Sequence, residues 1–262
     1  MTASYPSLPD LEGARVLITG ASTGIGAAMA EAFGHSRAVV GVHYHSSEDA
    51  ASTVAKRIEA AGGQAVLIKA DLTRRSAAAH LVDTFVGKAG GLDVLVNNAG
   101  GPELLKPVAE LTDADFDHVF DLNARCVFEV CRAALPHLRQ SRRSASVINV
   151  TSLSAHVGSG PGASVYGAAK AFVGAFSKSL ARELVSDGIR VNMLSPGFIA
   201  TPLHEKVSNP ALIAGWVKQI PMGRGGTPAD CAGTALFLAS PSLSGFITGQ
   251  VIEVNGGQLM AG

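Results

Sequence analysis

The stretch Thr19-Gly-Ala-Ser-Thr-Gly-Ile-Gly26 decides the fold of this chain. It follows the apolar run Val16-Leu-Ile18 and opens a helical pattern over residues 24–34. In this setting the first glycine permits a tight turn, the second lets the backbone approach a pyrophosphate, and the third lets the helix lie close to the sheet. The free amide groups at the start of the helix favour an anion. The stretch therefore predicts a dinucleotide-binding loop. The predicted contact residues are Gly20, Ser22, Thr23, Gly24, Ile25 and Gly26.

Short apolar runs and helical patterns alternate along the rest of the chain. The predicted strands are residues 16–18, 38–42, 65–68, 94–96, 146–150, 190–194 and 251–254. The predicted helices are residues 24–34, 48–61, 75–87, 113–140, 164–186 and 228–240. Most strand runs are continuously apolar, as expected for parallel strands covered on both faces. This order predicts an α/β fold, a Rossmann-like doubly wound parallel sheet of about seven strands with helices on both faces.

The pattern continues without a linker or an internal repeat, which predicts one domain over residues 1–262. Residues 1–12 are interpreted as an N-terminal extension. Residues 197–226 show no clear strand and carry several prolines and glycines. Because so long a connection in a compact domain is usually functional, we interpret it as a lid over the substrate.

Composition narrows the choice of partners. The 262 residues include 21 basic and 21 acidic side chains, so the net charge of zero argues against nucleic acid or an anionic membrane as the main partner. No secretory signal and no apolar run long enough for a bilayer is visible, which predicts a cytoplasmic protein. The three cysteines, Cys126, Cys131 and Cys231, are not spaced like a metal cage or a disulfide framework, so no metal site is expected.

A phenol and an ammonium stand four residues apart in Tyr166-Gly-Ala-Ala-Lys170, on one face of a predicted helix. The ordinary tyrosine pKa is about 10, and a cation within roughly 4–6 Å can lower it by about 1–3 units. The pair is therefore suited to transfer a proton to a carbonyl or from an alcohol. The alternative is that both side chains merely share a solvated helix face.

The end of the second predicted strand bears on the choice of nucleotide. A site that selects a free ribose 2′-hydroxyl normally has Asp or Glu at this position, whereas this chain has Tyr44, followed by His45 and Ser46. The absence of a repelling carboxylate favours NADP(H), with NAD(H) possible because no arginine is near in the sequence. His43 and His45 are interpreted either as surface histidines or as phosphate contacts.

Taken together, these residues resemble the short-chain dehydrogenase/reductase family, in its form of about 250 residues. The resemblance covers residues 14 to 260 and rests on several motifs in the same order. These motifs are the glycine loop, Asp71-Leu72, Asn97-Asn-Ala-Gly100, Asn123, Asn149-Val-Thr-Ser152, Tyr166-x-x-x-Lys170, Pro196-Gly197 and Asn255-Gly-Gly257.

The resemblance implies a set of cofactor contacts. Asp71 would accept from the adenine amino group, with Leu72 contributing its backbone; Asp71 could instead cap the next helix, or do both. A ribose would lie along Asn98, Ala99 and Gly100. The residues implied around the nicotinamide are Pro196, Gly197, Ile199 and Thr201, with Lys170 on the nicotinamide ribose.

The resemblance also implies catalytic roles. Tyr166 would be the general acid in reduction and the base in oxidation, with its pKa lowered by Lys170. Ser152 would donate to the substrate oxygen, although Ser154 is near enough in the sequence to compete. Asn123 would position a water that connects Lys170 to solvent.

These expectations favour an NADP-dependent oxidoreductase that interconverts a ketone or 3-oxo group and a secondary alcohol. A non-catalytic NADP-binding regulator and an NAD-dependent sugar or polyol dehydrogenase are the alternatives. Substrate contacts are expected from three segments, which are mostly apolar. They are residues 101–105, residues 154–163 with His156, and the predicted lid with Phe198, Leu203, His204, Trp216 and Met222.

Two predicted helices, residues 113–140 and 164–186, are apolar on several faces. A helix of this kind is buried on more than one side. We expect one side to pack on the sheet and the other on a second subunit, giving a homotetramer or a dimer. The alternative is a deep monomer core.

Overall fold

One parallel sheet organises the computed structural model, which describes residues 5–201 and 210–260. Its seven strands stand in the order β3-β2-β1-β4-β5-β6-β7, and every neighbouring pair is parallel. The strands are β1 (Arg15–Ile18), β2 (Val39–Tyr44), β3 (Gln64–Lys69), β4 (Val94–Asn97), β5 (Ser146–Val150), β6 (Arg190–Pro196) and β7 (Val251–Val254). Each predicted strand is present, which confirms the fold class.

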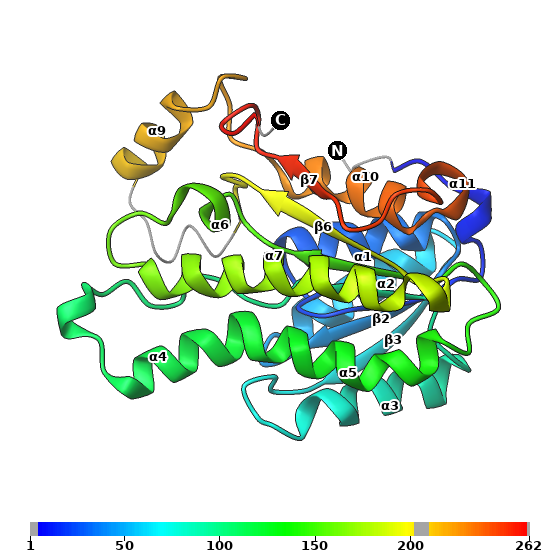
Figure 1. The fold of residues 1–262 in the computed structure, drawn as a ribbon. Helices are drawn as coiled ribbons and strands as arrows, with labels where there is room; N and C mark the ends of the chain where they lie inside the picture. The colour runs from blue at the N-terminus through cyan, green and yellow to red at the C-terminus, as the bar shows by residue number, and fades with distance from the viewer. Residues whose placement is uncertain (1–4, 202–209, 261–262) are drawn as a thin grey trace.

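Helices cover both faces of the sheet (Figure 1). The first face carries α1 (Gly24–His35), α2 (Glu48–Ala60) and α10 (Pro228–Ala239). The other face carries α3 (Ala77–Ala89), α5 (Cys126–Leu138) and α7 (Ser164–Leu184). The remaining helices are α4 (Asp113–Phe120), α6 (Ser154–Val157), α9 (Pro210–Lys218) and α11 (Pro241–Ser244). Both faces of the central strands are buried, which explains their continuous apolar runs.

The predicted helix 113–140 is wrong in one respect. A π-helical turn, Asp121–Arg125, separates α4 from α5. Such an insertion of one residue into a helix often marks a functional site. It could not be read from the apolar pattern, because a π turn leaves the neighbouring helical periods intact.

Two helices lie in segments for which no helix was predicted. α6 is a single turn after β5, and α9 lies within the segment interpreted as a lid. Residues 202–209 of that segment fall outside the described residues, so the lid remains a prediction. Figure 1 shows α6 and α9 beyond the carboxyl ends of β6 and β7.

Strand order determines where the site lies. The chain winds outward from β1 to β3, and then returns to place β4 on the other side of β1. Ligands of such sheets bind at the carboxyl ends of the strands, where the direction of winding reverses. Within the described residues, no helix combines the length and apolarity needed to cross a bilayer.

Candidate active site

A continuous cavity of ≈ 800 Å³ crosses the carboxyl ends of the strands, from the β1–α1 loop to α9. It brings together most of the residues predicted from sequence, although these come from seven separate segments. Those that line it are Gly20, Ser22, Thr23, Gly24, Ile25, Tyr44, His45, Ser46, Asp71, Leu72, Asn98, Ala99, Gly100, Ser152, Tyr166, Lys170, Pro196, Gly197, Ile199 and Thr201. Two predicted residues, Gly26 and Asn123, lie behind this surface.

The glycine loop is held in a shape that side chains would prevent. Gly20 and Gly24 have left-handed φ angles of 63° and 56°. A Cβ at Gly26 would stand 2.2 Å from the carbonyl oxygen of Gly20. The third glycine therefore allows close packing within the loop itself, rather than only between the helix and the sheet. The Asn98 Nδ2 group donates to the carbonyls of Thr19 (2.9 Å) and Gly20 (3.0 Å), which holds the loop against β4.

The start of α1 fits an anionic ligand. Thr23 is its N-cap residue, yet the Thr23 side chain accepts no hydrogen bond from the first amide groups of the helix. These amides and the helix dipole therefore lie at the cavity wall without a protein cap, and the adjacent Gly24 adds no Cβ to obstruct an approach. The residues present fit the pyrophosphate of a dinucleotide.

His43 is neither a surface histidine nor a phosphate contact, which corrects the sequence interpretation. Its ring is buried, and its Nδ1 accepts from the backbone N–H of Gly20 (2.9 Å). Its Nε2 lies 3.1 Å from the carbonyl oxygen of Ala70, so the neutral ring donates there. Burial lowers the pKa of His43 to about 4. This ring joins the glycine loop to the end of β3.

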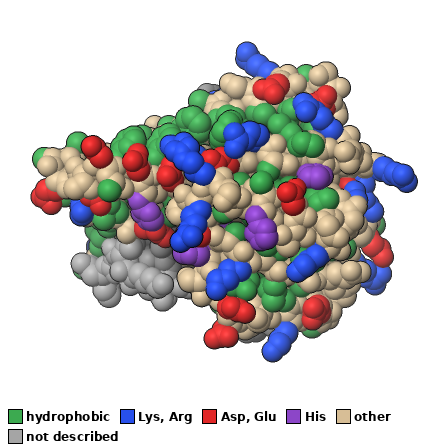
Figure 2. Space-filling model, turned by 90° about the horizontal axis from the view of Figure 1, so that it is seen from below, with side chains coloured by type: hydrophobic (Ala, Val, Ile, Leu, Met, Phe, Trp, Pro, Cys, Tyr) green, Lys and Arg blue, Asp and Glu red, His purple; other side chains and the backbone are tan. Residues whose placement is uncertain are grey.

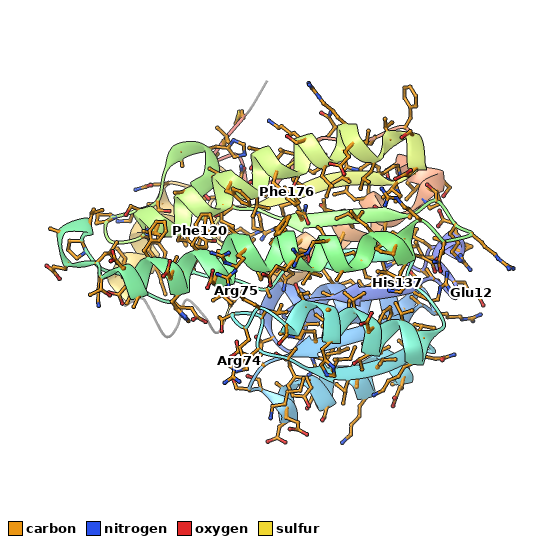
Figure 3. All side chains as sticks on the ribbon, turned by 60° about the horizontal axis from the view of Figure 1, so that its bottom comes forward. Glu12, Arg74, Arg75, Phe120, His137 and Phe176 are labelled. Atoms are coloured by element: carbon orange, nitrogen blue, oxygen red, sulfur yellow. The ribbon has the colours of Figure 1, made fainter. Side chains whose placement is uncertain are left out.

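The end of the cavity where the adenosine is expected is open to solvent. Tyr44 packs in the core beneath α1 and α2, whereas the side chain of His45 is 66% exposed. The carboxylate of Asp71 lies 3.9 Å from His45 Nε2 and 3.3 Å from the Nε of Arg74. Arg74 stands on the loop after β3 (Figure 3), so the fold places an arginine near His45 that the sequence did not reveal.

Asp71 does not cap the next helix, which is a second correction. α3 begins only at Ala77. The Asp71 carboxylate accepts instead from the backbone N–H (3.1 Å) and the hydroxyl (2.6 Å) of Thr73. These bonds hold the pKa of Asp71 below its ordinary value.

α7 places Tyr166 and Lys170 on consecutive turns at the other end of the cavity. The Lys170 Nζ donates to the carbonyl of Val150 (2.9 Å), and burial lowers its pKa to about 8. Burial raises the pKa of Tyr166, while a hydrogen bond with the side chain of Ser152 lowers it. The pKa of Tyr166 is thus raised on balance, and its lowering by the Lys170 ammonium remains a prediction.

Ser152 and Ser154 are distinguished by their contacts. Ser152, and not Ser154, is the serine whose side chain lowers the pKa of the Tyr166 phenol, and the Ser152 Oγ accepts from the backbone N–H of Ser154 (3.2 Å). The N–H of Leu153 donates to the carbonyl of Pro196 (2.9 Å), which ties this segment to the end of β6. Ser152 is therefore the serine that meets the phenol.

Asn123 lies in the π turn and is fully buried. Its Oδ1 accepts from the N–H of Gly101 (2.9 Å), and its Nδ2 donates to the carbonyls of Gly101 (3.2 Å) and Val119 (2.9 Å). A Cβ at Gly100 would stand 2.5 Å from Asn123 Oδ1 and 3.3 Å from Lys170 Nζ. Asn123 thus supports the wall beside the lysine, and the water that it would position remains a prediction.

Comparison with known proteins agrees with this geometry. A family model described as enoyl-(acyl carrier protein) reductase matches residues 20–258. The chain is 37% identical to 3beta-hydroxysteroid dehydrogenase 1 of Eggerthella lenta, over 96% of this chain and 95% of that protein. It is 39% identical to 3-oxoacyl-[acyl-carrier-protein] reductase of Synechocystis sp., over 93% and 96% of the two chains. The solved structure of an NADH-dependent reductase, A1-R′, responsible for alginate metabolism is 37% identical, with a TM-score of 0.89 and coverage of 97% and 100%.

The chain belongs to the short-chain dehydrogenase/reductase family. It is an oxidoreductase that acts on alcohol and carbonyl groups.

The substrate end of this short-chain dehydrogenase/reductase is mainly apolar. Phe198 and Trp216 are in contact, with ring centroids 5.4 Å apart. A hydrogen bond between His118 Nε2 and Glu103 Oε2 (3.0 Å) adds polar groups at the wall. Further apolar lining comes from Leu105, Leu122 and Leu212.

Some predicted substrate contacts lie elsewhere. His156 turns toward Glu253 of β7, with Nε2 and Oε1 3.3 Å apart, and does not line the cavity. Met222 lines a separate, smaller cavity. Leu203 and His204 lie outside the described residues. Gln258, which sequence reasoning missed, lines the main cavity; its only signal was its position directly after the Asn255-Gly-Gly257 motif.

Proposed function

We propose that this chain is an NADP(H)-dependent reductase that converts a ketone to a secondary alcohol, with Tyr166 as the proton donor. The observation that carries the proposal is that Ser152, Tyr166 and the buried Lys170 line one cavity. These groups line the same cavity as the uncapped start of α1. A proton donor and a dinucleotide cradle in one cavity suit hydride chemistry at a carbonyl.

A bound nicotinamide dinucleotide would supply the hydride in reduction and accept it in oxidation. The chain's own residues handle the oxygen of the substrate. Since Ser152 and Tyr166 line the same cavity, their hydroxyls can converge on one carbonyl oxygen. Ser152 would donate to that oxygen as negative charge develops, and Tyr166 would deliver the proton.

The pKa shifts favour reduction near neutral pH. Because burial raises the pKa of Tyr166, the phenol is protonated at pH 7, and this is the form that donates. Lys170, with a pKa of about 8, is mainly charged at the same pH. The oxidative direction needs the phenolate and should therefore improve as the pH rises.

The preference for NADP(H) rests on the adenosine end. His45, Ser46 and Ser47 line the cavity where an acidic side chain would select the free 2′-hydroxyl, and Arg74 adds a cation nearby. A second candidate, an NAD(H)-dependent dehydrogenase, is favoured by the 37% identity to the A1-R′ protein, which is named as NADH-dependent. Kinetics with both nucleotides on the same ketone would separate the two.

Tyr166→Phe tests the chemistry. General acids contribute about 10²–10⁴-fold, so we expect kcat to fall by at least about 10²-fold while the Kd for NADPH stays within about twofold. Tyr5→Phe is the matched control, since Tyr5 contacts His35 far from the cavity. An unchanged kcat in Tyr166→Phe would remove the assigned donor. A wild-type protein that binds NADPH but reduces no carbonyl would favour the non-catalytic regulator.

The face of α4, α5 and α7 supports a further part of the proposal, association with a second copy of the chain. Five phenylalanines form a continuous row of ring contacts there, with centroids 5.6–6.1 Å apart. They are Phe116, Phe120, Phe172, Phe176 and Phe128. Three of them are 40–49% exposed. Figure 2 shows hydrophobic side chains gathered on this side of the molecule, and Figure 3 places Phe120 and Phe176 on it.

Apolar surface of this kind on helices is typical of a subunit interface. We expect Phe172→Arg to convert a tetramer or dimer to a smaller species in size-exclusion chromatography with light scattering. Leu243→Arg, an exposed residue on α11, is the control. A wild-type monomer would support the alternative of a deep monomer core.

A further inference from the structure

The chain turns sharply after β7 and returns to the cavity. Asn255 holds this turn: its Oδ1 accepts from the N–H of Gly257 (2.9 Å), and its Nδ2 donates to the carbonyl of Leu259 (3.2 Å). Gly256 and Gly257 take left-handed φ angles of 63° and 89°. These bonds and backbone angles give the turn one defined conformation, which directs residue 258 back over the sheet.

The turn is also fastened to its surroundings. The Asn255 Nδ2 donates to the Oε2 of Glu253 (3.1 Å), and the Oε1 of the same carboxylate lies 3.3 Å from His156 Nε2 on α6. α6 directly follows the segment that carries Ser152. The C-terminal turn and the helix that follows the serine segment therefore lie next to each other beside β7.

Gln258 is the residue of this turn that reaches the cavity wall. Its Oε1 accepts from the backbone N–H of Phe198 (3.4 Å). A Cβ at the neighbouring Gly197 would lie 2.6 Å from that oxygen, so the side chain fits closely against the segment after β6. Its amide lines the same cavity as Ser152 and Tyr166.

The contact with Phe198 determines which way the amide faces. A backbone N–H can only donate, so the oxygen of Gln258 must be turned toward Phe198 and the NH₂ group away from it. Within residues 5–201 and 210–260 this NH₂ group has no hydrogen-bond partner. It is a donor on a wall that otherwise carries the rings of Phe198 and Trp216.

We propose that Gln258 is a specificity-determining residue, whose NH₂ group donates to a second oxygen of the carbonyl substrate. The substrate class is then an oxo compound with a hydrogen-bond acceptor, such as an ester, acid or hydroxyl oxygen, near the reacting carbonyl. Its remaining part is apolar and lies against Phe198 and Trp216. Pockets use a few polar groups of this kind to orient a mainly apolar ligand. This inference rests on the proposed ketone reduction.

The test compares four ketones: methyl 2-oxopentanoate, methyl 3-oxopentanoate, methyl 4-oxopentanoate and 2-hexanone. The three esters carry the second oxygen at different distances from the carbonyl, and 2-hexanone lacks it. We expect Gln258→Met to lower the ratio of kcat/KM for the best ester to that for 2-hexanone by about tenfold, the size of one hydrogen bond. Gln250→Met, an exposed glutamine just before β7, should leave the ratio unchanged.

Gln258→Glu distinguishes substrate recognition from support of the Phe198 segment. The carboxylate keeps an acceptor for the Phe198 N–H but has no donor, so the ratio should fall as far as in Gln258→Met. Restoration of the ratio by Glu, or an equal loss for all four ketones, would overturn the inference and leave Gln258 a purely structural residue. If wild-type enzyme reduced none of the four, the proposed function would fail and this inference with it; if it reduced them with an unchanged ratio in both variants, only this inference would fail.

Discussion

The two ends of the cavity differ in how firmly their side chains are held. At the catalytic end Lys170 is 3% exposed and hydrogen-bonded to Val150, and burial raises the pKa of Tyr166. At the adenosine end the side chains of His45 and Arg74 are 66% and 80% exposed and lie in solvent. The side chains at the catalytic end are therefore buried and held in place, whereas those at the adenosine end are exposed.

This difference has an energetic consequence. Exposed ion pairs contribute only about 0–1 kcal/mol each, so nucleotide preference at the open end is a sum of small terms. A preorganised donor in a water-poor site can contribute about 2.7–4 kcal/mol by itself. Substitutions at the buried end should therefore change kcat by several orders of magnitude. Substitutions at the open end should change the ratio of kcat/KM for NADPH and NADH by about one order of magnitude.

The largest expected effect after that of Tyr166 is at Ser152. Ser152→Ala removes the donor that meets the phenol, and we expect kcat for ketone reduction to fall about 10²–10³-fold. Ser154→Ala is the matched control and should change kcat by less than about threefold, because Ser154 holds Ser152 through its backbone. Steady-state kinetics of the two variants test this prediction. An equal loss of kcat in both would mean that Ser152 is not the single serine that donates to the substrate.

His43 sharpens the comparison, because it is a buried group at the open end. Its pKa is about 4 in the fold and about 6.5 in an unfolded chain. Between these values the unfolded state binds more protons, so the free energy of unfolding falls as the pH is lowered from 6.5 to 4. At about 1.4 kcal/mol per pKa unit, the full difference is worth about 3 kcal/mol.

Urea unfolding of His43→Gln at several pH values tests this linkage. A glutamine amide can accept from Gly20 and donate to Ala70 without titrating, so the variant should lose most of the pH dependence between 6.5 and 4. His80→Gln, at an exposed histidine on α3, should behave as the wild type. Parallel pH profiles for His43→Gln and the wild type would show that the buried ring does not stay neutral.

The smallest effect is expected at the exposed rim. His45→Asp places a carboxylate where a 2′-phosphate would lie, and like charges repel even when they are partly screened. We expect the ratio of kcat/KM for NADPH to that for NADH to fall by about tenfold. His80→Asp, which adds the same charge on α3, is the control. A wild-type enzyme that already prefers NADH would contradict the proposed nucleotide.

The catalytic pair was readable from sequence because helix geometry determines its spacing. Residues four apart share a helix face, so Tyr166 and Lys170 had to be neighbours wherever α7 packed. The glycine loop was readable for a similar reason: two of its glycines have left-handed backbone angles, which depend on a few adjacent residues. Continuous apolar runs likewise predicted parallel strands covered on both sides.

Other parts of the site depend on contacts between distant segments. The bond from Gly20 to His43 spans 23 residues, and the bond from Phe198 to Gln258 spans 60. No local pattern distinguishes a histidine that supports a loop from one in solvent. The π turn around Asn123 and the position of Arg74 near His45 likewise could not be predicted from a local sequence pattern.

The amino-acid sequence by itself determined the order of strands and helices, the dinucleotide loop and the phenol–ammonium pair, because short-range backbone geometry and periodic burial are written into neighbouring residues. Only the tertiary structure decided that His43 is buried and neutral, that Ser152 meets the phenol, and that a C-terminal glutamine reaches the cavity. These outcomes follow from which distant segments pack together, and that packing is a property of the whole core.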